Sequence, residues 1–180
     1  ATWTLAVEGL PAGHFVGVVR ADPVRSGLLY AGTDIGVYYS LDDGDHWQSL
    51  QRNLPTAWVR DLLVKGDDLI AATQGRAIWV LDNVSTLRQH DAISGTPGAH
   101  LFAPATAMRL RRNQNHDTPL PREEPAGRNP PTGAMIDYWL AAPARRVELE
   151  IRDSAGALVR RYASDAPDPA PIVERYFSAD

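Results

Sequence analysis

The chain has 180 residues, of which 44% are hydrophobic and 22% charged, the composition of an ordinary globular protein. Its net charge of −4 argues against a general nucleic-acid surface, which would be basic, and no run approaches the roughly 20 apolar residues of a membrane span. Cysteine is absent, which excludes disulfides and thiolate metal sites, and no feature of the sequence indicates a cofactor.

The first half of the chain alternates short β-type runs with turns rich in Pro, Gly and Asp. Strands are expected over His14–Val19, Leu28–Gly32, Val37–Leu41, Trp47–Leu50, Val59–Val64, Leu69–Thr73 and Ala77–Leu81. Most of these runs are β-branched or aromatic and evenly spaced. No window shows an apolar stripe of helical period, so the predicted fold class is all-β.

The turn between the third and fourth of these strands carries the most informative motif. It reads Ser40-Leu41-Asp42-Asp43-Gly44-Asp45-His46-Trp47. A carboxylate here can accept hydrogen bonds from the turn's own amides, Gly44 permits a left-handed backbone, and Trp47 supplies an apolar anchor. The pattern of Ser40, Asp42, Gly44 and Trp47 resembles the Asp-box of BNR-repeat β-propellers, a family that includes sialidases and sortilin-like receptors. In that family the box is a folding device remote from the active site.

Internal repeats agree with this resemblance. Trp3 and Trp47 lie 44 residues apart, within the length of one four-stranded propeller blade. Leu29–Thr33 is echoed by Leu69–Thr73 at a spacing of 40. Residues 1–88 are therefore expected to form about two terminal blades of a propeller.

The opening Ala1–Leu5 resembles the end of another Asp-box, whose last positions are commonly Thr-Trp. This predicts that the chain is a piece of a longer polypeptide, whose remaining blades would be partners of this segment. The resemblance to bacterial BNR-repeat proteins also implies an exported protein, either secreted or periplasmic.

The second half of the chain has a different composition. Residues 89–133 are rich in Pro, Gly and Arg and read as a linker or an ordered wrap, in which His100–Pro104 could dock on a sheet. Further strands are expected over Ala134–Leu140, Val147–Ile151 and Leu158–Tyr162. Residues 134–180 resemble part of a small immunoglobulin-like β-module. The predicted architecture is a partial β-propeller followed by this module.

No metal site is predicted. Asp42, Asp43 and Asp45 form the densest acidic cluster, but their spacing does not match a calcium-binding loop, and turn chemistry explains them. The histidines are scattered and form no ligand pair. They are His14, His46, His90, His100 and His116.

No complete catalytic set is predicted either. Sialidases use a Tyr nucleophile, an arginine triad and a Phe-Arg-Ile-Pro motif, and that motif is absent. Nothing in the spacing of Arg60, Arg76, Arg109, Arg111, Arg112, Asp61 and Asp137 favours an anion site with an acid over ordinary surface charge. Trp58, at a loop-to-strand entry, and Arg76 are the candidate ligand contacts, with packing as the alternative reading of Trp58.

Three functions fit these patterns. The first is a non-catalytic scaffold, or a module that binds a glycan or a protein. The second is part of a glycoside hydrolase whose catalytic residues lie on blades outside this chain. The third is a sortilin-like ligand receptor. In each case the exposed strand edges of so few blades predict self-association.

Overall fold

The computed structural model describes residues 2–107 and 133–167. These residues form β-strands in small antiparallel sheets, together with one helical turn, α1 (Ser85–Arg88), and a 3₁₀ turn, η1 (His90–Ile93). No sheet closes on itself among them. The prediction of an all-β fold is confirmed. The chain divides into two compact units, Ala1–Trp139 and Leu140–Asp180.

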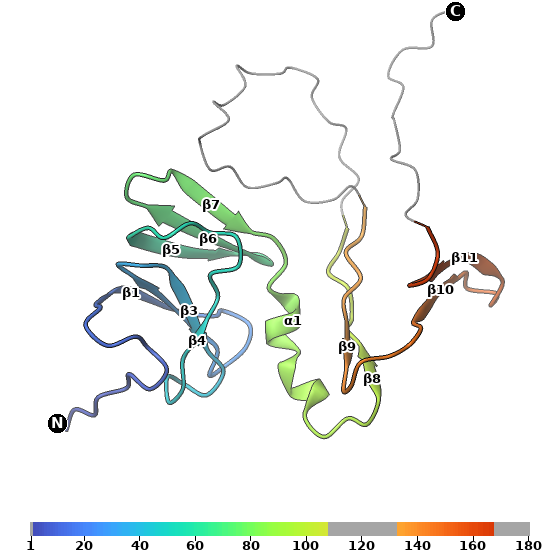
Figure 1. Ribbon diagram of the computed structural model, residues 1–180, viewed down its shortest axis with the longest axis horizontal. Coiled ribbons are helices and arrows are strands. Elements are labelled where there is room, and N and C mark those ends of the chain that lie inside the picture. Colours follow the sequence, from blue (N-terminus) through green and yellow to red (C-terminus); the bar gives the residue numbers. More distant parts are fainter. Residues whose placement is uncertain (1, 108–132, 168–180) are drawn as a thin grey trace, which may run out of the picture. The chain divides into compact units, whose positions relative to one another are not determined.

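The first sheet is a four-stranded meander (Figure 1). Its strands follow chain order, β1 (Val16–Ala21), β2 (Leu29–Thr33), β3 (Val37–Ser40) and β4 (Gln48–Ser49). Short Pro- and Gly-containing turns connect them, as neighbouring antiparallel strands allow. β4 is shorter than the predicted Trp47–Leu50 because the Trp47 N–H donates to the Glu8 carbonyl, outside the sheet.

The second sheet repeats the same meander with three strands, β5 (Val59–Lys65), β6 (Asp68–Thr73) and β7 (Ile78–Leu81). In both sheets the first strand carries a bulge near its start, between Val16 and Val18 in β1 and between Val59 and Asp61 in β5. The two sheets therefore share backbone geometry as well as strand order.

A threonine closes the second hairpin of each sheet in the same way. Thr33 Oγ1 donates to the Gly36 carbonyl at 3.0 Å, and Thr73 Oγ1 donates to the Ala77 carbonyl at 2.6 Å. The backbone N–H of each threonine donates to the same carbonyl. The sequence echo at a spacing of 40 thus corresponds to a structural repeat.

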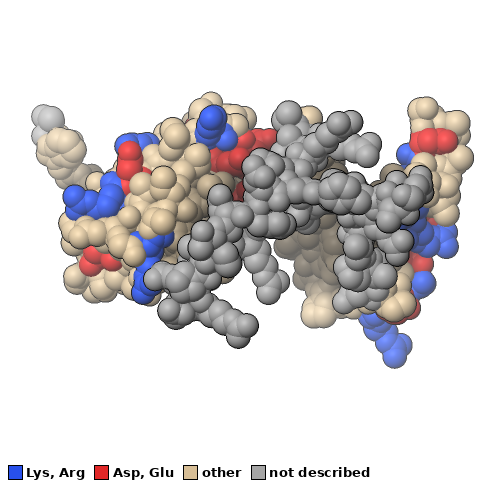
Figure 2. Space-filling model, turned by 90° about the horizontal axis from the view of Figure 1, so that it is seen from above, with Lys and Arg blue, Asp and Glu red and all other residues tan. Residues whose placement is uncertain are grey.

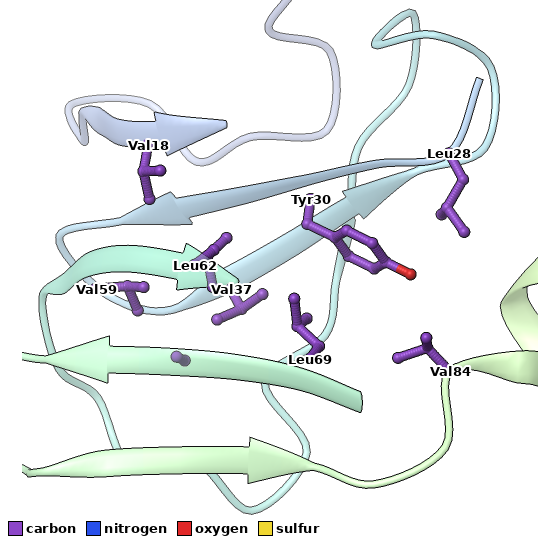
Figure 3. Close-up of a cluster of buried hydrophobic side chains, with 9 residues drawn as sticks. Val18, Leu28, Tyr30, Val37, Val59, Leu62, Leu69 and Val84 are labelled. Carbon is purple, nitrogen blue, oxygen red and sulfur yellow. The ribbon is translucent and has the colours of Figure 1, made fainter. Parts of the chain in front are cut away.

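The two sheets pack face to face, and the core of the first unit lies between them. Figure 3 shows apolar side chains from both sheets pointing toward one another. The buried members are Val18, Leu28, Tyr30 and Val37 from the first sheet and its turns, Val59, Leu62, Leu69 and Ala71 from the second, and Val84 ahead of α1. Removing this apolar surface from water is what holds the sheets together.

Three elements that follow the sheets, α1, η1 and β8, are absent from the sequence prediction. α1 spans only four residues, too few to show a helical period. β8 (Ala99–Leu101) pairs with β9 (Tyr138–Leu140), and Phe102 beside β8 is buried. β9 covers only the end of the predicted strand Ala134–Leu140.

The second unit contains one hairpin among its described residues, formed by β10 (Glu148–Arg152) and β11 (Leu158–Ala163). Asp153 closes the turn, since its Oδ1 accepts the N–H groups of Ala155 and Ala157. Both strands match the predicted runs to within one residue at each end.

Candidate functional site

The turn formed by residues 40–47 is held together by its own side chains. Ser40 Oγ donates to Asp42 Oδ1 at 2.7 Å and accepts the Gly44 N–H at 2.9 Å. Asp42 Oδ1 also accepts the His46 N–H at 2.9 Å. Backbone amides in the turn are thereby paired without water, and this is the mechanism by which short polar residues stabilise turns.

The Asp42 carboxylate also contacts the His46 ring. Its Oδ2 lies 2.6 Å from His46 Nδ1. The hydrogen bond from the His46 amide, followed by those from the His46 ring and the Ser40 hydroxyl, lowers the pKa of Asp42 to about 2. The same contact with Asp42 raises the pKa of His46 above its ordinary value. Both oxygens of this carboxylate are therefore hydrogen-bonded within the turn.

The backbone of the turn requires the residue types found there. Gly44 has φ of +99°, in the left-handed region that side chains disfavour, and Asp43 has φ of +64°. Trp47 is buried, and its Nε1 donates to the Ala6 carbonyl at 3.1 Å. Trp47 thus fixes the chain that enters the first sheet to the turn that precedes β4.

The candidate contact Trp58 lies in an aromatic and cationic cluster. Phe15 packs edge-on against it with ring centroids 5.2 Å apart, and the Arg60 guanidinium lies 3.9 Å above the indole ring. Trp58 Nε1 is buried and has no acceptor among the described residues. The Trp58 ring is half-buried and packs against Phe15, and the side chains of Phe15 and Arg60 are exposed beside it.

Arg76, the other candidate contact, is exposed in the turn between β6 and β7. Trp58 directly precedes β5, and Val59 of β5 lies opposite Thr73 of β6, so Trp58 and Arg76 lie at the same end of the second sheet. The 40–47 turn lies at the opposite end of the first sheet from the start of β1. Val16 of β1 pairs with Thr33 at the end of β2, whereas Ser40 pairs with Leu29 at the start of β2. The structure thus separates the motif from the candidate contacts.

The remaining candidates do not converge on one site. Asp61 forms an ion pair with Arg20, in which Asp61 Oδ1 lies 2.6 Å from Arg20 Nη2. Asp137 Oδ2 accepts a hydrogen bond from Asn83. Arg109, Arg111, Arg112 and His116 lie outside the described residues. Within residues 2–107 and 133–167, no three His, Asp or Glu side chains gather as a metal site would require.

The sequence did not predict a polar network that joins Arg88 to Asp22, Tyr30 and Asp67. Arg88 Nε donates to both oxygens of Asp22, each at 3.0 Å, and its Nη1 donates to Asp67 at 2.6 Å. Tyr30 donates its hydroxyl to Asp22 at 3.2 Å. Burial raises the pKa of Asp22, but hydrogen bonds from two backbone amides and from Arg88 outweigh it and leave that pKa lowered. Burial, followed by the Asp22 charge, raises the pKa of Tyr30.

On the face seen in Figure 2, basic and acidic residues are interspersed among uncharged ones. Among the described residues, no helix is long and apolar enough to span a membrane. Comparisons with models of protein families, with curated proteins and with solved structures found no match.

Proposed function

We propose that this chain is a non-catalytic segment of a BNR-repeat β-propeller within a larger exported bacterial protein, where its two sheets serve as blades. The observation that carries the proposal is the repetition of one plan in both sheets. Each sheet has a meander of the same order, a bulge at the same place in its first strand, and a threonine that closes its second hairpin. A propeller is built by such repetition.

The geometry of the 40–47 turn supports a scaffold role for the motif. Both carboxylate oxygens of Asp42 accept hydrogen bonds within the turn, from Ser40 and His46, and Trp47 is buried. A folding device needs this self-contained arrangement, whereas a catalytic acid or nucleophile must be free to meet a substrate.

The ligand-contact surface of this module is the end of the sheets that carries Phe15, Trp58, Arg60 and Arg76. A partly exposed aromatic ring beside a guanidinium offers a flat apolar surface and a cation together. Arginine recognises planar carboxylates well. A glycan or peptide that bears a carboxylate therefore fits this surface best.

The matched ligands sialyllactose and lactose test this assignment, because they differ by the sugar that carries the carboxylate. We expect saturable binding of sialyllactose, weaker binding of lactose, and loss of the difference in Arg60→Ala and Arg76→Ala. Arg145→Ala, which changes an exposed arginine of the second unit, is the control. Equal affinity for both sugars would refute the ligand surface, and release of sialic acid would refute the non-catalytic role.

A further inference from the structure

Arg60 owes its position beside the Trp58 ring to the bulge in β5. The bulge falls between Val59 and Asp61, so Arg60 is the extra residue and has no partner on β6. A bulge redirects the side chain of its extra residue, and bulges are common beside active sites. Arg60 and Asp61 are both exposed here, whereas Val59 is buried. The bulge thus turns Arg60 outward, and its guanidinium lies 3.9 Å from the centroid of the Trp58 ring.

The equivalent bulge in the first sheet has no such cation. Phe15 precedes β1 as Trp58 precedes β5, and the extra residue of the β1 bulge is Gly17. Gly17 has no side chain that could lie over the Phe15 ring. The two sheets therefore share the aromatic position, but only the second adds an arginine to it.

The charge of Arg60 is not neutralised by its neighbours. The adjacent carboxylate, that of Asp61, pairs with Arg20 instead. Within residues 2–107 and 133–167, no carboxylate forms an ion pair with Arg60. A guanidinium stays charged and presents its N–H donors in a planar fork that matches a carboxylate. Arg60 is therefore a cation whose fork can meet the carboxylate of a ligand.

The Trp58 indole is held by its own chain. Its Nε1 is buried, and Phe15 packs edge-on against the ring with centroids 5.2 Å apart. The Trp58 carbonyl accepts the Gln74 N–H at 2.8 Å, which fixes the backbone as well. The polar group that this cluster presents to a ligand is thus the Arg60 guanidinium above the ring.

We propose that Trp58 is a positioning residue for Arg60, and that Arg60 so placed selects ligands that bear a carboxylate. Contact with the indole restricts the guanidinium before the ligand arrives, and such preorganisation removes part of the entropy that binding would otherwise cost. This role rests on the ligand surface proposed above, and it means that Trp58 acts through Arg60 rather than by stacking on the sugar.

Sialyllactose and lactose distinguish these two roles of Trp58 in a calorimetric titration. If Trp58 positions Arg60, Trp58→Leu should reduce the preference for sialyllactose by roughly 3- to 30-fold, the range of a cation–π contact. Lactose binding should hardly change. Trp58→Phe keeps a ring beneath the guanidinium and should keep most of the preference. Arg60→Lys keeps the charge without the planar fork and should lose most of it. Trp139→Leu, which removes a half-buried tryptophan of β9, is the control and should change neither affinity.

A double-mutant cycle tests whether Trp58 acts through Arg60. In the Arg60→Ala background, Trp58→Leu should have no further effect on the preference for sialyllactose. NMR of the free protein adds a measurement that needs no ligand. The indole ring should shift the Cδ protons of Arg60 upfield, and Trp58→Leu should abolish this shift whereas Trp139→Leu should leave it.

Failure of the positioning role can be told apart from failure of the ligand surface. If the wild-type chain bound both sugars equally, the ligand surface and the positioning role would fall together. If Arg60→Ala abolished a preference for sialyllactose, but Trp58→Leu weakened both sugars equally or neither, only the positioning role would be overturned. Full preference in Arg60→Lys would overturn it too, and that exposed position keeps the test decisive even where Trp58→Leu does not fold.

Discussion

Asp22 and Arg88 are 66 residues apart in sequence and form an ion pair that joins the first hairpin to α1. The Asp22 side chain is fully buried, the Arg88 side chain is 9% exposed, and the Arg88 Nε lies 3.0 Å from both carboxylate oxygens. Arg88 also reaches Asp67, in the turn between β5 and β6. One guanidinium therefore ties together the two sheets and the helical turn that follows them.

Arg88→Ala is expected to lower the free energy of unfolding by about 3–5 kcal/mol, because it leaves Asp22 as a buried charge without its partner. The loss should shrink at acid pH, where protonation removes that charge from Asp22. Chemical denaturation at neutral and at acid pH measures both effects. Arg145→Ala, at an exposed position, is the control, and an equal loss in both variants would contradict the role of the pair.

Ser40→Ala is expected to lower the free energy of unfolding by about 1–3 kcal/mol. Ser40 is 1% exposed, and its Oγ accepts the N–H of the buried Gly44, which would lose its partner. Thermal and chemical unfolding of Ser94→Ala, which alters an exposed hydroxyl, provides the comparison. If the two alanine variants were equally stable, the Ser40 hydroxyl would not be holding the turn.

The contact between Asp42 and His46 predicts a titration that NMR can follow. His46 should titrate above its ordinary pKa of 6.5, because the Asp42 carboxylate favours the charged ring. The stability gained through His46 is complete below pH 6.5 and is lost as the pH rises through the raised pKa. The stability gained through Asp42 is complete above pH 3.8 and is lost as the pH falls through about 2.

Asp42→Asn should return the His46 pKa toward 6.5, whereas Glu8→Gln should leave most of the shift, since Glu8 lies 3.9 Å from the His46 ring. A His46 pKa that Asp42→Asn leaves in place would exclude this contact in solution.

Local patterns in the sequence predicted the strands well, since each alternating run lies between turn residues that act over short range. The pairing of Asp22 with Arg88 could not be predicted, because no local pattern links residues so far apart. The late start of β4 could not be predicted for the same reason. The Trp47 N–H donates to the carbonyl of Glu8, a residue distant in sequence that lies before the first sheet. Trp58 was a candidate contact with packing as the alternative, but its partner Phe15 could not be predicted, because that contact depends on how two sheets meet.

Gly32 of the first sheet packs closely against Val59 of the second. A Cβ built there would lie 2.7 Å from Cγ1 of Val18 and 2.7 Å from Cγ1 of Val59. Valine side chains are stiff at χ1, so neither can move aside cheaply. Gly32→Ala is therefore expected to cost about 1–3 kcal/mol by overpacking, although the counterpart of Gly32 in the second sheet is Ala72.

A double-mutant cycle separates this overpacking from a general effect of alanine in a strand. Val59→Ala removes the Val59 methyl groups but leaves Cγ1 of Val18 in place, so part of the cost of Gly32→Ala should be lost in that background. Ala72→Gly measures the same chemical change in reverse on the outer face of the second sheet, where strand propensity alone should make glycine slightly worse. Strictly additive costs for Gly32→Ala and Val59→Ala would mean that Val59 of the second sheet does not crowd this glycine.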